Sequence, residues 1–248
     1  MYFRSLRETR RIILVVMAVP LVVPIFMLVV FSRVFGDILQ GTGLSGSTSY
    51  VQYVAPGAIL MAVMLPATAS VSVAIERQNG FYDRMRISPM GPRCSNLARR
   101  IGDATKLLGF ALVLLLVSWV AGADIHNWPM ALVLGGGLSA LWGFGYSGLS
   151  FAACLRTGKA EIAEALLPAF FPLVFVSSAF VPLENLPGWM EAVATYNPLT
   201  YLCDAIRGAY TGDLDARATG IAVLSTVLMI ALSQLLIARA EHKVASST

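Results

Sequence analysis

The sequence predicts an all-α polytopic membrane protein with six transmembrane helices, cytoplasmic termini and short re-entrant helices before the last span. Three observations predict this class: the apolar composition, the number of long apolar runs and the placement of the basic residues. The 248 residues are 57% hydrophobic and only 13% charged, whereas soluble domains carry about a quarter charged residues. This deficit of charge indicates a chain that is solvated by lipid.

Six apolar runs are long enough to be spans. They cover residues 12–35, 51–75, 105–123, 129–155, 163–180 and 219–238. Each is near or above the ~18 residues that carry a helix across a bilayer core. Helices are the expected form, because a lipid-exposed segment has to satisfy its own backbone hydrogen bonds. The first run lacks a small-x-small cleavage pattern, so we expect a retained anchor rather than a signal peptide.

The basic residues set the predicted orientation. With these spans, 15 of the 18 Lys and Arg residues fall on one side, in the N-terminus, the second and fourth interspan segments and the C-terminus. Only Arg33, Arg207 and Arg217 fall opposite. Cytoplasmic segments are enriched in Lys and Arg, so both termini are predicted to lie in the cytoplasm, and the charge excess of +4 is a topology signal. No basic face with interleaved aromatics stands apart from the spans, so we expect no nucleic-acid partner.

The segment 181–218, which begins VPLENLPGWMEAVATYNPLTY, is too polar to span and too apolar for a plain loop. Asn197 followed by Pro198 is typical of a helix start, and Gly208 is the predicted stop. A shorter amphipathic turn places Trp189 and Val193 together. Two short helices that dip back toward the membrane would account for this composition, because non-spanning backbone at that depth is tolerated where protein buries it.

The cytoplasmic segment 76–104 is mainly basic but carries apolar side chains among its charges. These are Phe81, Tyr82, Met85, Ile87 and Met90. Two interpretations stay open: a solvated basic loop, or a short amphipathic helix that fills a groove on a soluble partner. Gly80 and the Ser88-Pro89 pair would bound such a helix.

Two short motifs resemble catalytic signatures without completing them. GTGLSGST, residues 41–48, approaches a phosphate-binding loop but has Ser47 at the lysine position, so we expect no ATP site on this chain. GYSG, residues 145–148, is similar to the serine motif of rhomboid proteases, yet the sixth span offers Ser147 no histidine base. The three cysteines and two histidines lack metal-ligand spacing, so no metal site is expected.

Charge inside the predicted spans is scarce, which disfavours ion-coupled transport. Apolar and aromatic residues in three of the spans suggest a path for apolar or amphipathic compounds. The candidates are Met61, Met64, Phe144, Phe170, Phe171 and Phe175. Packing or contact with lipid is the alternative explanation for each of them.

The broken segment before the last span, with its P-G-W and N-P-L-T-Y elements, and the loop start ERQNGFYDRMRISPM together resemble the ABC-2 type transporter permeases. The similarity is strongest to the daunorubicin-resistance and multidrug exporter branch and covers essentially the whole chain as a single domain. It implies the membrane half of an exporter for a drug, antibiotic or lipid-like compound, in the bacterial cytoplasmic membrane. A rhomboid-like protease, or a permease for lipid or polysaccharide, is the alternative.

The resemblance also implies partners and site residues. ATP and Mg²⁺ would bind a separate ATP-binding cassette subunit, no cofactor would bind this chain, and a second permease copy or a related permease would complete the pathway in the lipid. The residues implied for docking on the ATPase are Glu76, Arg77, Gly80, Phe81, Tyr82, Met85 and Pro89. The residues implied for the outer re-entrant segment are Pro182, Pro187, Gly188, Trp189, Asn197, Pro198, Tyr201, Asp204 and Arg207. Met64, Phe144, Phe171 and Phe175 are the candidates for the substrate path.

Overall fold

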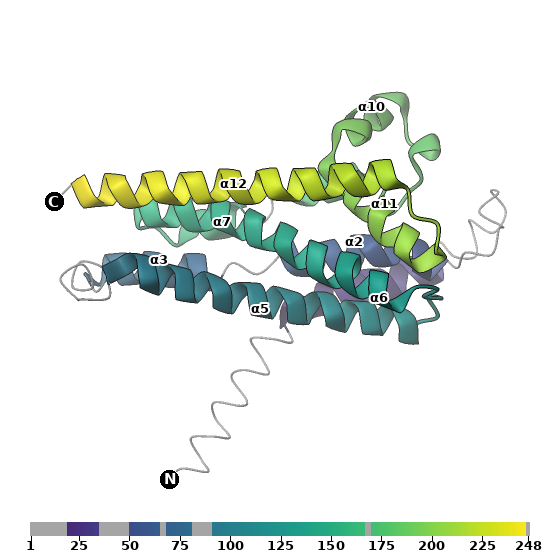
Figure 1. The fold of residues 1–248 in the computed structure, drawn as a ribbon, viewed down its shortest axis with the longest axis horizontal. Helices are drawn as coiled ribbons and strands as arrows, with labels where there is room; N and C mark the ends of the chain where they lie inside the picture. The colour runs from purple at the N-terminus through teal and green to yellow at the C-terminus, as the bar shows by residue number, and fades with distance from the viewer. Residues whose placement is uncertain (1–18, 35–49, 65–67, 81–90, 167–169, 247–248) are drawn as a thin grey trace, which may run out of the picture.

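The computed structural model describes residues 19–34, 50–64, 68–80, 91–166 and 170–246, and every regular element in these ranges is a helix. The long helices lie nearly side by side along one axis (Figure 1). Four helical stretches are long and apolar enough to cross a membrane. They are Tyr50–Gln78, which contains α2 (Tyr50–Met64) and α3 (Thr68–Gln78), Cys94–Val120 within α5 (Gly91–Val120), Trp128–Thr157, and Ala216–Val244 within α12 (Ala216–Ser246).

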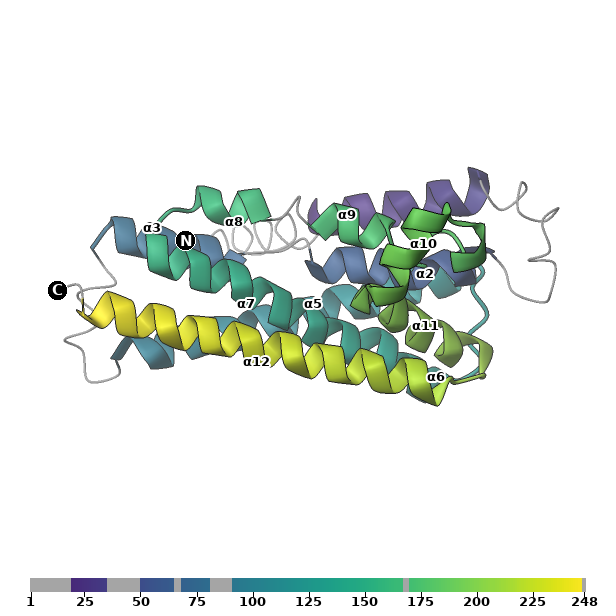
Figure 2. The ribbon, with the colours of Figure 1, turned by 90° about the horizontal axis from the view of Figure 1, so that it is seen from above.

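The two other predicted spans differ from this pattern. The first is a helix described over Val19–Val34, shorter than the four long stretches. The fifth, predicted over 163–180, is described as α8 (Glu161–Leu166) and α9 (Phe170–Phe175), and residues 167–169 between them lie outside the described residues. Figure 2 shows α8 beside α3, and α9 beside α2 and the helix Val19–Val34. Pro168 lies outside the described residues, and Pro172 lies inside α9, where its ring removes a backbone donor.

The second interspan segment of the prediction contains more helix than expected. Within 76–104, α3 continues to Gln78 and α5 already begins at Gly91. At 1.5 Å per residue, the 30 residues of α5 and the 31 residues of α12 extend about 45 Å. Both helices therefore exceed a ~30 Å hydrocarbon core and carry basic residues beyond it at the end where α3 stops.

The stretch Trp128–Thr157 is the centre of the bundle. It consists of α6 (Trp128–Ala131), the π-helix η1 (Leu132–Leu138) and α7 (Ser139–Thr157), and 72% of its most apolar window is buried, against 22% for α12. Its glycines permit close approach: a Cβ on Gly143 would lie 2.5 Å from the carbonyl oxygen of Val63, and one on Gly145 would lie 2.8 Å from Met229 Cγ. Gly137 differs from them, because the nearest such atom to a Cβ there is 3.9 Å away.

After α9 the chain turns through η2 (Leu183–Asn185), α10 (Gly188–Tyr196) and α11 (Pro198–Thr211) before it enters α12. These elements cover the end of the bundle opposite the C-terminus (Figure 1). We call this end the α11 end, and the opposite end, where α3 stops and α12 finishes, the α3 end.

Candidate functional site

The N-terminus of α11 is fixed to the chain that follows α9. The Asn197 side chain accepts a hydrogen bond from the Leu199 backbone N–H at 3.0 Å, which confirms it as the N-cap. Its Nδ2 group donates to the carbonyl oxygens of Leu173 at 2.5 Å and Val176 at 2.9 Å. The buried amide of Asn197 therefore joins the start of α11 to the segment 173–176, which lies about twenty residues earlier in the sequence.

The predicted end of this helix is wrong. The helix continues through Gly208 to Thr211, and Gly212, with φ of +83°, is its C-cap. Gly208 instead allows the following turn to pack closely against α11, because a Cβ there would lie 2.7 Å from the carbonyl oxygen of Asp213. A glycine in a sequence signals either close approach or a helix end, and the sequence alone did not separate the two.

Arg207 is the centre of a polar network at the α11 end. Its Nη1 lies 2.6 Å from Asp204 Oδ1, and its Nη2 donates to the carbonyl oxygen of Ser178 at 2.8 Å. The guanidinium also lies 3.8 Å from the centre of the Tyr53 ring on α2. Tyr53 Oη donates to the same Ser178 carbonyl at 2.9 Å, and Ser178 Oγ lies 3.1 Å from Asp204 Oδ1. The network ties α11, α2 and the turn after α9 into one unit.

α10 presents an apolar face that the rest of the described chain does not cover. Trp189 is 69% exposed, Val193 is 52% exposed and Tyr196 is 88% exposed, whereas Ala194 is fully buried. The sequence placed Trp189 and Val193 together correctly, and Tyr196 extends this face. Pro187 is the N-cap residue of α10 and Gly188 its first residue, and Pro182 is the N-cap residue of η2.

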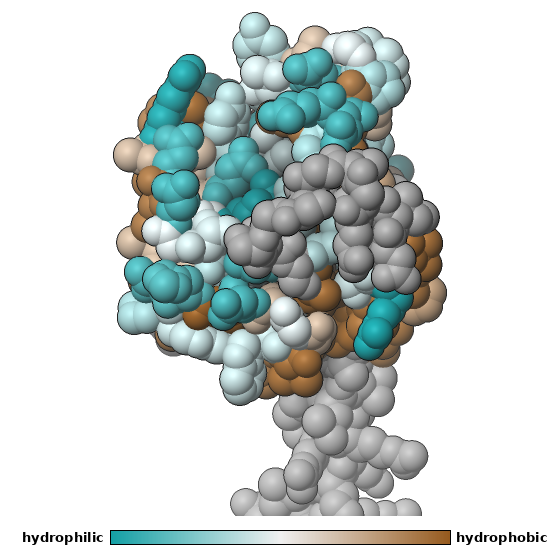
Figure 3. Space-filling model, turned by 90° about the vertical axis from the view of Figure 1, so that its right-hand side faces the viewer, coloured by the Kyte–Doolittle hydropathy of each residue, from teal (hydrophilic) through white to brown (hydrophobic). Residues whose placement is uncertain are grey.

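Tyr201, on the first turn of α11, holds α10 against α11, because its Oη donates to the carbonyl oxygen of Thr195 at 2.8 Å. Seen face-on, this end carries hydrophilic residues over much of its surface, with hydrophobic residues along part of the rim (Figure 3). An amphipathic cap of this kind suits the boundary between lipid and water.

At the α3 end, the end of α3 is fastened to two other helices. Glu76 pairs with Arg99 of α5 at 2.6 Å. Arg77 Nη1 donates to the carbonyl oxygen of Leu155 on α7, and Gln78 Nε2 donates to that of Gly158 at 2.9 Å. Gly80, with φ of +66°, ends the described segment in a left-handed turn. Phe81, Tyr82, Met85 and Pro89 lie outside the described residues, so their docking role stays a prediction.

Arg100 is a functional candidate that the sequence did not identify. From the sequence it was counted only among the basic residues of the segment 76–104, but it lies on α5, is 4% exposed and packs against α7. Its Nη2 donates to the carbonyl oxygen of Phe144 at 2.7 Å, and its guanidinium lies 4.1 Å from the centre of the Phe144 ring. Gly148 leaves room for this guanidinium, because a Cβ there would collide with Nη1. The signal that could have found it is the position of Arg100 three residues before Asp103, on one face of a continuous helix.

Asp103 confirms that charge is buried near this end. It is 7% exposed, accepts a hydrogen bond from the Ala69 backbone N–H at 3.0 Å and pairs with Lys106 at 2.9 Å. Its carboxylate therefore joins the start of α3 to α5. A buried charge is tolerated when such partners replace water.

Of the four candidate path residues, Met64 belongs to the main core, and Phe144 and Phe171 pack against it. Phe171 and Phe175 belong to a row of aromatic rings, with centroids 6.4 Å apart, that continues from Phe175 to Phe180 at 5.2 Å. Phe144 lies apart from this row, under Arg100. Met64 is 2% exposed in the main core. The substrate path through them stays a prediction.

Ser147 lacks the partner that a serine nucleophile needs. Its Oγ donates to the carbonyl oxygen of Phe144 in its own helix at 3.2 Å. His126 lies against Gly212 at the α11 end, and His242 is exposed near the end of α12. The GYSG segment is therefore a close-packing element of α7. The GTGLSGST segment lies outside the described residues.

Comparison with known proteins gives a consistent picture. The model of the family "ABC-2 type transporter" matches residues 1–211. The chain is 24% identical over 213 residues to the "Daunorubicin resistance ABC transporter permease protein DrrB1" of Streptomyces coeruleorubidus, covering 84% of this chain and 73% of that protein. It is 26% identical over 197 residues to the "Probable doxorubicin resistance ABC transporter permease protein DrrC" of Mycobacterium tuberculosis, covering 77% of this chain and 69% of that protein.

Proposed function

This chain belongs to the ABC-2 type transporter family, and on that premise we propose that it is the membrane subunit of an ATP-binding cassette exporter. ATP and Mg²⁺ bind a separate cassette subunit, and this chain supplies the route across the bacterial cytoplasmic membrane. Relatives named for daunorubicin and doxorubicin resistance support a hydrophobic or amphipathic cargo of the drug or antibiotic type. A second copy of this chain, or a related permease, completes the pathway.

The proposed topology has six spans and both termini in the cytoplasm. The helix Val19–Val34 and the α8–α9 segment add the first and fifth crossings to the four long stretches. The distribution of Lys and Arg places the α3 end inside, and the α11 end, with its short helices, becomes the re-entrant cap on the outer side. Arg99, Arg156, Arg239 and Lys243, on the parts of α5, α7 and α12 that approach the α3 end, support this orientation.

The observation that carries the proposal is the attachment of α3. Because Glu76, Arg77 and Gln78 fasten its last turn to both α5 and α7, a displacement of the segment after α3 is passed to three helices at once. The residues 81–90 that follow are the proposed docking segment for the ATPase. A motion imposed there therefore reaches α7, the most central helix of the bundle.

The proposed mechanism is a linked two-state motion. Nucleotide-driven closure of the cassette subunits pushes the docking segments, and the long helices rock between states open to opposite sides. The π-helix η1, with its three consecutive glycines, supports a hinge in this scheme, because π-helical turns occur at functional sites. The Arg207 network holds the cap together while the helices below it move.

The test is the ATPase activity of the complex. The chain is co-expressed with a cassette ATPase encoded beside it, and the complex is purified and assayed with and without drug. Phe81→Glu and Met85→Glu should abolish stimulation by drug without preventing membrane insertion, because a carboxylate cannot be accommodated in an apolar groove. Asp83→Asn in the same segment is the matched control. Stimulation that is unchanged in both glutamate variants would contradict the docking role.

A further inference from the structure

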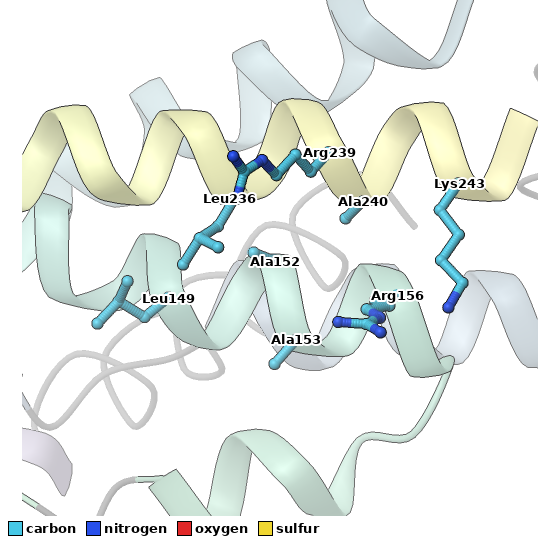
Figure 4. Close-up of a pocket in the computed structure, with 8 residues that line it drawn as sticks. All are labelled: Leu149, Ala152, Ala153, Arg156, Leu236, Arg239, Ala240 and Lys243. Atoms are coloured by element: carbon cyan, nitrogen blue, oxygen red, sulfur yellow. The ribbon is translucent and has the colours of Figure 1, made fainter.

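A pocket is formed between α7 and α12. It has a volume of about 380 Å³ and lies between the C-terminal halves of these two helices, near the α3 end (Figure 4). Its lining is Leu149, Ala152, Ala153 and Arg156 from α7, and Leu236, Arg239, Ala240 and Lys243 from α12. Leu236 and Lys243 reach from α12 toward α7 across it (Figure 4).

The lining is divided between an apolar part and a basic part. The small side chains of Ala152 and Ala240 are buried and leave the space between the helices open. Leu149 and Arg156 are seven residues apart on α7, as are Leu236 and Lys243 on α12, which is about 10 Å along each helix. Both helices run in the same direction, so Leu149 and Leu236 lie toward the α11 end of the pocket, and Arg156 and Lys243 lie toward the α3 end (Figure 4).

The polar part of the lining is basic. Three cations and no carboxylate line the pocket. Arg156 and Arg239 have no acidic partner within ion-pair distance among the residues that the structure describes. Glu241, on the next turn of α12, accepts from Asn96 Nδ2 at 2.9 Å and is thereby turned toward α5. Like charges in one pocket repel one another, so an anion between the helices would be stabilised.

The surroundings favour an anion that carries its own hydrocarbon. α12 is the least buried of the four long helices, so in the proposed topology much of its surface is available to lipid. A phosphate at the level of Arg156 and Arg239 would have an acyl chain beside Leu149 and Leu236. Basic pockets between transmembrane helices on the cytoplasmic side are suited to anionic lipid head groups.

We propose that this pocket binds the phosphate of an anionic phospholipid of the cytoplasmic leaflet, such as phosphatidylglycerol or cardiolipin. Arg156 and Arg239 hold the phosphate, and Leu149 and Leu236 hold the first part of an acyl chain. The leaflet assignment rests on the orientation in the proposed function, whereas binding itself does not. A bound lipid joins α7 to α12 at the end where the ATPase is proposed to dock.

The experiment measures lipid retention by the purified full-length chain in detergent, by native mass spectrometry after titration with phosphatidylglycerol, cardiolipin or phosphatidylcholine. We expect retention of the two anionic lipids over phosphatidylcholine. Arg156→Gln and Arg239→Gln should each weaken it about fivefold, and the double variant about thirtyfold. Arg217→Gln, at the other end of α12 and exposed, is the matched control and should retain lipid like the wild type.

Several outcomes would overturn the proposal. These are equal retention of phosphatidylcholine, unchanged retention in the double variant, and displacement of the lipid by millimolar inorganic phosphate, which would indicate a site for free phosphate. Loss of ATPase co-purification in the double variant with lipid retention intact would assign the arginines to the partner instead. If the double variant fails to fold, the wild-type comparison of anionic with zwitterionic lipid still decides. The measurement requires neither ATPase nor transport, so its failure is distinct from failure of the proposed function.

Discussion

The Arg207 network predicts a measurable coupling between two residues at the α11 end. Arg207→Gln removes the 2.6 Å contact with Asp204, the 2.8 Å bond to the Ser178 carbonyl and the cation–π contact with Tyr53 at 3.8 Å. Hydrogen bonds to charged groups contribute about 1.5–3 kcal/mol each, and an exposed cation–π contact about 0.5–1 kcal/mol. Because the Asp204 side chain is 34% exposed, water compensates in part, and we expect a total loss of about 3 kcal/mol.

The assay is the free energy of unfolding in mixed detergent micelles, titrated with sodium dodecyl sulfate and followed by tryptophan fluorescence. Asp204→Asn should cost less, about 1.5 kcal/mol, because Arg207 keeps its hydrogen bond to the Ser178 carbonyl. The double variant should show a coupling of at least about 1 kcal/mol, as expected for residues in one network. Arg217→Gln is the control and should change stability by less than about 0.5 kcal/mol. Additivity of the two single variants within about 0.5 kcal/mol would refute the network.

Three further predictions follow from individual contacts. Gly143→Ala should destabilise the protein by about 1–3 kcal/mol, because its Cβ would meet the Val63 carbonyl at 2.5 Å. The control Gly220→Ala, which has open space around it, should be neutral or stabilising. Equal effects of the two changes in the unfolding assay would contradict the close packing. Asn197→Ala should cost about 2 kcal/mol in the same assay, since a cap and two carbonyl partners are lost; a cost near zero would count against this attachment. Glu76→Arg should reduce the drug-stimulated ATPase activity of the complex. Addition of Arg99→Glu should restore this activity, because the ion pair at 2.6 Å is then rebuilt with reversed charges. Failure of the second change to restore it would argue against a role of the pair in coupling.

Most of the helical architecture could be predicted from the sequence, because apolar length and helix caps are local properties. The Asn197-Pro198 start of α11 was predicted correctly. The end of the run 163–180 was not, because α9 ends at Phe175 and residues 176–180 form turns, and apolar content alone does not mark where a helix ends. The early start of α5 was missed for a related reason: its first turns are basic, and charge was taken as a sign of a loop.

The site residues were predictable only where the backbone pattern was distinctive. Asp204 and Arg207 were selected from the family resemblance, but their partners Tyr53 and Ser178 are more than twenty residues distant in sequence and carry no local signal. Arg100 was missed because its burial depends on Gly148, whose missing side chain makes the space. Long-range packing of this kind is invisible to composition and periodicity.

The most direct test of the account concerns the side on which the α3 end lies. Cys94, on the first turn of α5, is exposed, whereas Cys154 and Cys203 are buried, so the unmodified chain has one accessible thiol. A membrane-impermeant maleimide should leave Cys94 unlabelled in intact cells and label it in inside-out vesicles, and Cys94→Ala should abolish the signal. Labelling of Cys94 in intact cells would place the attachment of α3 on the outer side, where no cytoplasmic ATPase could drive it.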